Sequence, residues 1–336
     1  MGNTERNEEA EAAIRISGLC KTYEGFSLKD VSLTVPKGSV MGFIGQNGAG
    51  KTTTIRALLN MIPIDSGEIS LLGCDYREDA VKEEIGVVFD EMGFHRQLTA
   101  AQLNKMFRHI YKHWDESVFF LWLERLGLPP KRKIGKFSRG MQMKLQIAVA
   151  LSHHAKLLIL DEPTSGLDPI VRHEMLDVFL DFVQDEEHAI LLSSHITSDL
   201  ERIADYITFI DKGRILLSGE RIDILENHHL IKCKKEQAGE IPPQYIVGKH
   251  VTSFGAEVLV KGLPALPGDF VMEEVNLEEI MVYYAQRRDP TKLGGYLRAD
   301  LRSGHNILCE KSSQTAHRQS QIDDKVYYAQ RRDPGQ

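Results

Sequence analysis

The clearest chemistry in the sequence lies in residues 45–53, which read GQNGAGKTT. They contain the pattern G-x-x-x-x-G-K-[ST], in which glycines let successive backbone N–H groups turn toward phosphate oxygens. An apolar run, residues 39–44, precedes the pattern, and a helix-compatible run, residues 53–61, follows it. This is the strand, loop and helix context that the motif requires. We therefore expect the loop to bind the phosphates of a nucleotide.

Individual residues of the loop have separate expected tasks. Lys51 would place a positive charge between the β- and γ-phosphates, and the Thr52 hydroxyl would ligand Mg²⁺. The alternative, a glycine-rich turn with an incidental lysine, is disfavoured because every position of the pattern is present with the correct flanks. The expected nucleotide-binding residues of the loop are Gly45, Asn47, Gly48, Gly50, Lys51, Thr52 and Thr53.

Two adjacent carboxylates form the second candidate group. The apolar run 157–160 delivers Asp161 and Glu162 to its C-terminal end, the edge at which parallel α/β sheets place ligands. Beside a phosphate loop, Asp161 suits the Mg²⁺ shell and Glu162 suits a general base that polarises the attacking water. Carboxylates at the end of a buried strand with no task would be costly, so a purely structural role is disfavoured. His195 has the same placement after the apolar run 189–193.

Two further positions leave alternatives open. Ser138 is a suitable N-cap for a helix that reaches about Ser152, and Gly140 permits close approach, so this helix start is either a second anion site or only a cap. Tyr23 lies upstream of the phosphate loop, where its ring could stack on an adenine. Ordinary strand packing is the stronger interpretation of that tyrosine from the residue alone.

The elements that must position these residues follow from periodicity. Alternating apolar residues between positions 13 and 35 predict strands. Apolar residues recur at helical spacing between Thr99 and His154, which predicts a helical insert between two sheet segments. The runs 206–211 and 214–218 predict a hairpin that closes the first domain near residue 222. Strands alternating with helices indicate an α/β fold.

The C-terminal third carries a weaker signal. Residues 245–260 look strand-like and residues 273–286 look helical, which predicts a small α+β appendage. Residues 291–336 are polar with little periodicity, as is typical of a disordered tail. The segment VYYAQRRDP at 282–290 recurs identically at 326–334. Two copies do not make a repeat fold, so we interpret the second as a partial gene duplication that leaves a dispensable tail.

Composition and charge argue against several classes of function. A chain of 336 residues suggests about two domains, and its formal charge of −7 argues against general attraction to nucleic acid or anionic lipid. No stretch approaches the ~18 apolar residues that cross a bilayer, so work at a membrane would need another chain that spans it. The cysteines contain no C-x-x-C pair and are expected to be free thiols in a reducing compartment. They are Cys20, Cys74, Cys233 and Cys309.

Taken together and in this order, the motifs resemble those of the nucleotide-binding subunit of ATP-binding cassette (ABC) transporters, over about residues 13–222. The sequence FSRGM at 137–141 matches the family's signature, usually written LSGGQ, which other phosphate-loop ATPases lack. The remaining matches are Tyr23 to the adenine-stacking aromatic, residues 45–53 to the phosphate loop, Asp161 to the magnesium aspartate, Glu162 to the catalytic glutamate, residues 165–168 to the loop after it, and His195 to the switch histidine.

The resemblance implies a mechanism that local chemistry leaves open. Two such domains pack head to tail, and each ATP is held between the phosphate loop of one domain and the signature of the other. Ser138, Arg139 and Gly140 would then act in trans, and Asp168 would belong to the loop that follows the catalytic glutamate. Glu162 and His195 would be catalytic. ATP and Mg²⁺ would close the dimer, and hydrolysis would release it.

The resemblance also implies partners and a location. The expected partner is a separate multi-helix permease of the export type, with a homodimer or heterodimer of ATPase subunits on it and no nucleic acid. The chain would be cytoplasmic and peripheral on the inner face of the cell membrane. Three positions depart from the family pattern: Asp90 stands where a glutamine is usual, and Arg139 and Met141 replace a glycine and a glutamine of the signature. Because Glu162 and His195 are retained, we expect competent hydrolysis.

The expected organisation is a phosphate-loop NTPase fold of the ABC ATPase type with a helical subdomain and a small C-terminal α+β appendage. Two other functions are considered. A soluble cassette ATPase acting on ribosomes or in cluster assembly is disfavoured by the single set of motifs and the negative charge, and a nucleotide-gated regulator with little turnover is favoured only by Asp90. The expected boundaries are a disordered lead at 1–12, the ATPase domain at 13–222 with its helical part at about 97–154, the appendage at 223–290, and the tail at 291–336.

Overall fold

The computed structural model describes residues 12–264 and 270–286, which belong to one compact unit. The expected lead-in at 1–12 lies outside the described residues except for Ala12, which begins the first strand. The expected tail at 291–336, with the second copy of the duplicated segment, lies outside them as well. The sulfurs of Cys20, Cys74 and Cys233 are free, as expected, and Cys309 is not among the described residues.

A six-stranded sheet forms the centre of the ATPase part, with the strand order β10-β9-β3-β8-β7-β6. The strands from β9 to β6 in that order are parallel, and β10 is an antiparallel edge strand. The predicted hairpin at the end of the first domain is confirmed as β9 and β10. The bounds are β3 Val40–Ile44, β6 Ile85–Val88, β7 Leu157–Asp161, β8 Ala189–Ser194, β9 Tyr206–Asp211 and β10 Arg214–Glu220.

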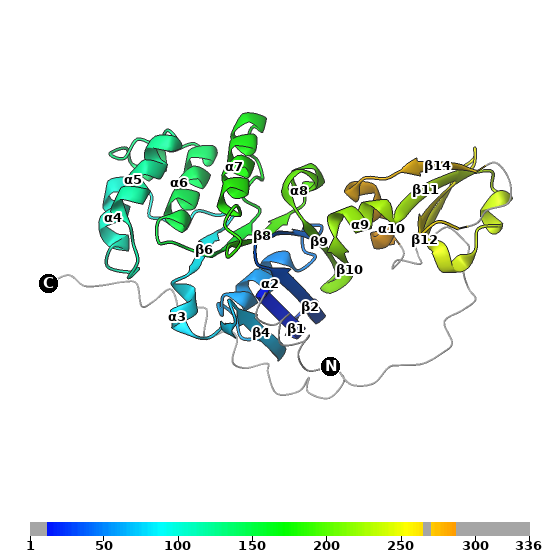
Figure 1. Cartoon of the computed structure of the whole chain (residues 1–336), viewed down its shortest axis with the longest axis horizontal. Coiled ribbons are helices and arrows are strands. Elements are labelled where there is room, and N and C mark those ends of the chain that lie inside the picture. The colour runs from blue at the N-terminus through cyan, green and yellow to red at the C-terminus, as the bar shows by residue number, and fades with distance from the viewer. Residues whose placement is uncertain (1–11, 265–269, 287–336) are drawn as a thin grey trace. The chain divides into compact units, whose positions relative to one another are not determined.

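The central strands are apolar because both faces of this sheet are covered. Along β7, Leu158 and Leu160 join a core on one face, while Leu157 and Ile159 join a core on the other. The first core includes helices α6, α7 and α8, and the second includes α2 and an antiparallel sheet, as Figure 1 shows. The bounds are α2 Lys51–Leu58, α6 Arg139–Leu151, α7 Pro169–Phe182 and α8 Thr197–Ile203.

The antiparallel sheet has the order β2-β1-β4-β5 and confirms the strands predicted between residues 13 and 35. Glu24 and Gly25 form the turn between β1 and β2. Its buried side chains, among them Ile14, Leu28 and Val31, pack with α2 behind the phosphate loop. The bounds are β1 Ala12–Tyr23, β2 Phe26–Pro36, β4 Ser66–Leu71 and β5 Cys74–Asp75, followed by α3 Asp79–Lys82.

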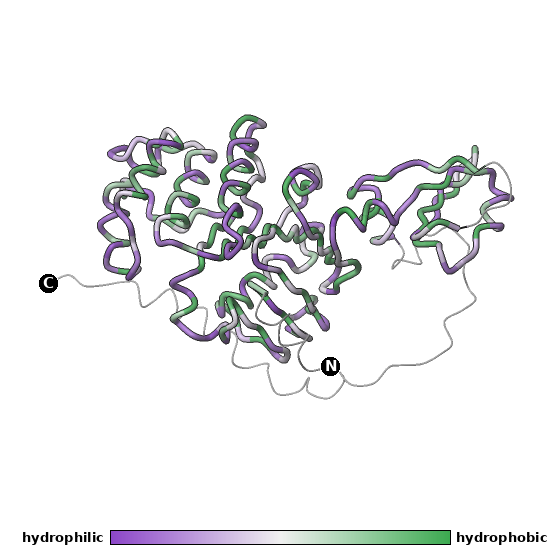
Figure 2. The backbone as a smooth tube through the Cα atoms, in the orientation of Figure 1, coloured by the Kyte–Doolittle hydropathy of each residue, from purple (hydrophilic) through white to green (hydrophobic). Residues whose placement is uncertain are grey.

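A helical segment between β6 and β7 confirms the predicted insert. Thr99 and Gln102 form a reciprocal capping box at the start of α4, and the Asp115 carboxylate caps α5. The tube in Figure 2 alternates between hydrophobic and hydrophilic along these helices, because one face of each is buried. The bounds are α4 Ala100–Phe107, α5 Glu116–Arg125, the 3-10 turn η1 Ile134–Lys136, and α6, which ends the insert.

The C-terminal segment is a four-stranded antiparallel sheet, order β12-β13-β11-β14, with one helix after it. The strand-like run predicted at 245–260 is two strands joined by a turn at 252–255, and β11 was not predicted. The bounds are α9 Arg221–Glu226, β11 His228–Cys233, η2 Gln237–Gly239, η3 Pro243–Tyr245, β12 Ile246–Val251, β13 Ala256–Lys261, β14 Val271–Glu274 and α10 Leu277–Gln286.

The helix predicted at 273–286 begins at Leu277, later than expected. Glu273 and Glu274 belong to β14, which pairs with β11. Asn276 then starts the helix, because its side chain accepts a hydrogen bond from the Glu279 N–H at 2.9 Å while the Glu279 carboxylate accepts one from the Asn276 N–H at 3.0 Å. The Leu277 N–H donates to Glu201 of α8 at 2.8 Å, so α10 is bonded to the ATPase part.

Within residues 12–264 and 270–286, none of the helices has the length and apolarity needed to span a bilayer.

The helical insert offers a matched test of its core. Leu123 of α5 is 2% exposed and Leu121 of the same helix is 62% exposed. We expect Leu123→Ala to lower the free energy of unfolding by about 2–5 kcal/mol, because it leaves a cavity. Leu121→Ala should change it by no more than about 0.5 kcal/mol. Urea unfolding followed by circular dichroism measures both, and equal effects would contradict the packing described for α5.

Candidate nucleotide site

The phosphate loop joins the end of β3 to the start of α2. Gly50 is the N-cap of α2 at φ 120°, a backbone conformation that side chains disfavour, and an added Cβ would lie 2.7 Å from the Leu28 side chain. Lys51 is the first residue of the helix and only 6% exposed. Its ammonium donates a hydrogen bond to the Gly45 carbonyl at 2.6 Å. The last part of the phosphate loop is thus bonded to its first residue through the lysine side chain.

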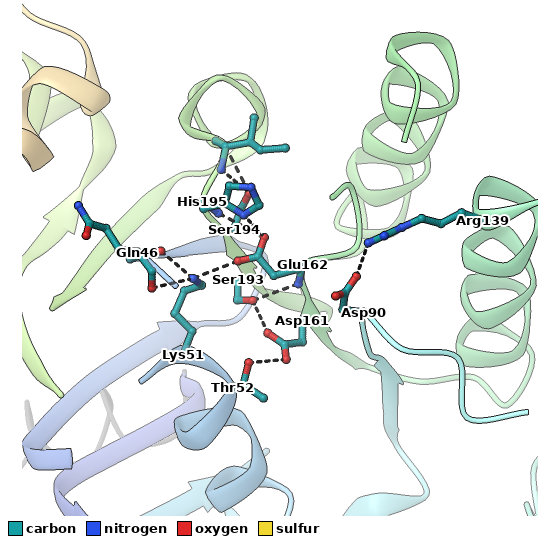
Figure 3. Close-up of polar contacts among 12 residues, drawn as sticks. Gln46, Lys51, Thr52, Asp90, Arg139, Asp161, Glu162, Ser193, Ser194 and His195 are labelled. Carbon is teal, nitrogen blue, oxygen red and sulfur yellow. Dashed lines mark hydrogen bonds and ion pairs between the residues drawn. The ribbon is translucent and has the colours of Figure 1, made fainter. Parts of the chain in front are cut away.

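The Lys51 ammonium also meets the predicted catalytic carboxylate. Its Nζ lies 3.0 Å from Oε1 of Glu162, a distance that makes an ion pair, although the angle is not that of a hydrogen bond. The other oxygen of Glu162, Oε2, contacts Nδ1 of His195 at 2.7 Å and accepts a hydrogen bond from the His195 N–H at 3.3 Å. Figure 3 shows the three side chains converging, Lys51 from the start of α2 and Glu162 and His195 from the ends of β7 and β8.

Glu162 holds this position with an unusual backbone. Its φ is 52°, in the left-handed region where non-glycine residues are uncommon. Its N–H points back to β8, where it donates to the carbonyl and the hydroxyl of Ser193 at 3.2 and 3.1 Å. The sharp turn after β7 therefore directs the carboxylate toward Lys51 instead of along the sheet.

Asp161 and Thr52 form a second contact beside the first. Asp161 is 4% exposed, and its Oδ2 accepts a hydrogen bond from the Thr52 hydroxyl at 2.9 Å. The predicted pair for Mg²⁺ is thus brought together, with one carboxylate and one hydroxyl. These donors fit Mg²⁺, which takes few protein oxygens and completes its shell with water and phosphate oxygens. Among the described residues, no group of three or more His, Cys, Asp or Glu side chains could hold a metal ion.

Ser193 is a site residue that the sequence analysis missed. Its hydroxyl is fully buried, donates to Oδ1 of Asp161 at 2.6 Å and accepts the N–H of Glu162. One side chain therefore orients the Asp161 carboxylate and holds the backbone of Glu162. The available signal was a pair of hydroxyl residues, Ser193 and Ser194, at the end of an otherwise apolar strand.

The signature residues lie at the start of α6. Ser138 caps the helix by accepting the Met141 N–H at 3.2 Å, which confirms the predicted cap. Gly140 faces α7, since an added Cβ would lie 3.4 Å from a methyl group of Val171. Arg139 pairs with Asp90 at 2.5 Å, apart from the lysine and carboxylate contacts in Figure 3.

The other predicted residues have simpler surroundings. Asp168 caps α7 by accepting the N–H groups of Ile170 and Val171, each at 3.1 Å. Tyr23 ends β1 and is 43% exposed, and the Lys21 ammonium lies 5.3 Å from the centre of its ring. Asn47 and Gly48 are exposed in the phosphate loop, and Thr53 is half-buried in the first turn of α2.

This geometry defines a class of protein. A phosphate loop between a parallel strand and a helix, with an aspartate that contacts the loop threonine and a glutamate that contacts the loop lysine, is the arrangement of a phosphate-loop nucleoside triphosphatase.

Comparisons with known proteins narrow this class. The ABC transporter family model matches residues 28–165. The bacitracin transport ATP-binding protein BcrA of Bacillus licheniformis is 38% identical over 211 residues, which are 60% of this chain and 68% of that protein. The lantibiotic transport ATP-binding protein SrtF of Streptococcus pyogenes is 37% identical over 210 residues, which are 62% of this chain and 90% of that protein.

A solved structure, described as that of the ATP-binding subunit of an ABC transporter, has a TM-score of 0.59 and 26% sequence identity, and the match covers 64% of this chain and 92% of that one. The chain belongs to the ATP-binding subunits of ABC transporters, which are ATPases. The ABC ATPase fold and the role as an ATP-binding subunit of a transporter, both implied by the sequence motifs, are therefore confirmed.

The missed serine generates a prediction. Ser193→Ala removes the hydrogen bond that orients Asp161, so we expect the Mg²⁺ concentration for half-maximal ATP hydrolysis to rise by on the order of tenfold. Ser194→Ala is the control, because that neighbouring buried hydroxyl bonds only to backbone atoms of Ile196. Steady-state hydrolysis over a Mg²⁺ titration measures the shift, and equal curves for Ser193→Ala and the native chain would remove Ser193 from the site.

Proposed function

We propose that this chain binds ATP in the site around Lys51, hydrolyses it with Glu162 as general base, and thereby drives a separate transmembrane permease. The observation that carries the proposal is that Lys51 and Thr52, at the start of α2, meet Asp161, Glu162 and His195, at the ends of β7 and β8, through contacts of 2.7 to 3.0 Å. The transport role is supported by the relatives, whose names describe them as transport ATP-binding proteins.

Binding would exchange the partners of Lys51. The Lys51 ammonium contacts the backbone carbonyl oxygens of Gly45 and Gln46 and a carboxylate oxygen of Glu162. The β- and γ-phosphate oxygens of ATP carry more negative charge than a single carboxylate, and they would attract the lysine from Glu162. The glutamate oxygen that the lysine leaves is then available to a water molecule. The exchange couples arrival of the triphosphate to release of the base.

In the hydrolytic step, the oxygen of this water attacks the γ-phosphorus, its proton moves to the Glu162 carboxylate, and ADP leaves with the bridging oxygen. His195 holds the other carboxylate oxygen through Nδ1 and the backbone N–H, which fixes the direction of the base. Thr52 and Asp161 would hold Mg²⁺, whose charge offsets that of the phosphates when it is bound. Tyr23 would stack on the adenine.

We propose that the start of α6, formed by Ser138, Arg139 and Gly140, completes the site of a second ATPase subunit through the N–H groups of its helix N-terminus, and that Asp168 lies near the contact. The starts of α6 and α7 pack together at Gly140 and Val171, and beside them Ile170 is 80% exposed. Ile170 thus exposes a large apolar side chain next to the N-terminus of α6, a helix of 13 residues. Such a surface suits a contact that a second subunit covers. ATP-driven closure of such a dimer would be the conformational change that is transmitted to the permease.

The remaining aspects concern organisation and cargo. We propose that residues 13–222 form the ATPase domain and 223–290 an accessory domain, and that the permease holds the chain at the inner face of the cell membrane. Two relatives are named for bacitracin and lantibiotic transport, so bacitracin and lantibiotics are the first cargoes to test.

The general-base role is tested with Glu162→Gln. We expect kcat to fall by about 10²- to 10⁴-fold, since the amide does not accept the proton, while nucleotide affinity is retained and a dimer accumulates with ATP. Rapid phosphate release and size-exclusion chromatography measure these effects. Glu187→Gln, at an exposed carboxylate paired with Lys37, is the control. Undiminished turnover in Glu162→Gln would remove Glu162 as the base.

Removal of the loop lysine should act on binding itself. We expect Lys51→Ala to weaken ATP affinity by about tenfold or more, because the phosphates lose a charge-assisted contact. Fluorescence titration with a labelled ATP analogue measures this, and Lys82→Ala, at an exposed lysine paired with Asp79, serves as the control. Equal affinities for all three proteins would contradict the assignment of the phosphate loop.

The permease partnership needs a separate experiment. Affinity purification of the tagged chain from detergent extracts of its source cells should recover a multi-helix membrane protein in amounts comparable to the chain. Recovery of ribosomes without such a protein would favour the alternative role in translation.

A further inference from the structure

Two of the residues that depart from the family pattern, Asp90 and Arg139, contact one another. Asp90 replaces the usual glutamine, and Arg139 replaces a signature glycine. A nitrogen of the Arg139 guanidinium donates to Oδ1 of Asp90 at 2.5 Å. Asp90 lies in the loop after β6 and Arg139 is the first residue of α6, so the pair joins two elements that are far apart in sequence. Each substitution supplies the counter-charge of the other.

The same guanidinium lies close to a third element, the loop that contains Gly166. An added Cβ at Gly166 would lie 3.1 Å from Cζ of Arg139 and 3.2 and 3.3 Å from two of its nitrogens. Gly166 has φ 67°, where a side chain would be strained, and it lies four residues after Glu162. Arg139 therefore lies over the loop that carries the chain away from the catalytic glutamate, and Asp90 holds it there.

A second bond ties the loop after β6 to α6. The buried amide of Gln146, in the middle of α6, donates to the carbonyl of Phe89 at 3.1 Å. The residue before Asp90 is thus fixed to the same helix as Arg139. This bond sets the loop close enough for the Asp90 carboxylate to reach the guanidinium.

Asp90 is turned toward Arg139 and not toward the Mg²⁺ candidates. Figure 3 shows its carboxylate in contact with the guanidinium, while Asp161 accepts the hydroxyl hydrogen bonds of Thr52 and Ser193. If the Asp90 carboxylate turned toward Asp161 and Glu162, it would be repelled by their negative charges. Beside Arg139 it accepts a charge-assisted hydrogen bond instead.

We propose that Arg139 is a positioning residue for hydrolysis and that Asp90 is its anchor. The pair fixes the loop of residues 162–168 against the start of α6, and so sets Glu162 relative to the signature. This inference rests on the proposed function, in which Glu162 is the base. Because both side chains are about half exposed, the pair contributes little to the free energy of unfolding. Its loss should therefore appear in turnover while the fold is kept.

A double-mutant cycle tests the proposal. We expect Asp90→Asn and Arg139→Gln each to lower kcat several-fold, with KM for ATP and the thermal unfolding midpoint unchanged. The double variant should be no slower than the slower single variant, because both changes remove one contact. The exchanged variant, Asp90→Arg with Arg139→Asp, should recover part of kcat. In Asp90→Asn the Mg²⁺ concentration for half-maximal activity should equal that of the native chain.

A matched ion pair elsewhere provides the control. Arg125 and Asp181 also lie 2.5 Å apart with similar exposure, at a distance from the strand ends that carry the site. Arg125→Gln and Asp181→Asn should leave kcat unchanged. If they lower it as much as the Asp90 and Arg139 variants do, the effect is a general result of losing surface charge and the proposal is wrong.

Other outcomes would also overturn the inference. If the fold-reduction of kcat in the double variant equals the product of the fold-reductions in the two single variants, Asp90 and Arg139 act independently. A raised Mg²⁺ requirement in Asp90→Asn would assign Asp90 to the metal, and a raised KM for ATP in Arg139→Gln alone would assign Arg139 to the nucleotide. The variant Glu162→Gln distinguishes failure of the proposed function from failure of the positioning role. If Glu162→Gln hydrolyses ATP as fast as the native chain, the proposed function is wrong. If Glu162→Gln is slow but the double-mutant cycle fails, only the positioning role of Arg139 is wrong.

Discussion

The ion pair between Lys51 and Glu162 is the contact on which the arrangement of the site depends. The lysine is 6% exposed and the glutamate side chain 14% exposed, and a charge with so little water around it is stable only beside an opposite charge. The lysine begins the helix that follows β3 and the phosphate loop, and the glutamate follows β7, which lies two places along the sheet from β3. The register of β3, β8 and β7 must therefore be kept for the pair to form.

The two cores explain how that register is maintained. Successive residues of β7 and β8 enter opposite cores, so a shift by one residue would exchange every side chain between faces that differ in shape and partners. On one face the helices α6 and α7 bring the signature and the Asp168 cap to the same edge of the sheet; on the other, α2 brings Lys51 and Thr52. The chemistry lies at the edge where both layers end.

Much of this could be predicted from the sequence, because the site residues lie in short contiguous motifs at the ends of apolar runs. Residues 45–53, Asp161, Glu162 and His195 were placed in this way. Contacts between distant segments could not be predicted. The Ser193 hydroxyl and the pair of Asp90 with Arg139 depend on sheet order and on a helix that returns to the sheet from the insert. Strand β11 was missed because its pairing with β13 and β14 is long-range, whereas its local sequence is mixed.

The left-handed backbone at Glu162 has a consequence for how this position can vary. A glutamate there costs on the order of 1 kcal/mol or more of folding free energy relative to a residue that adopts this conformation freely. Selection for stability alone would replace it with glycine or asparagine, and β-branched residues would be excluded. The glutamate at this position therefore lowers the stability of the fold, and its role in the site is the reason to keep it. Stabilised versions of this protein obtained by selection on thermal resistance alone are expected to lose function first at this residue.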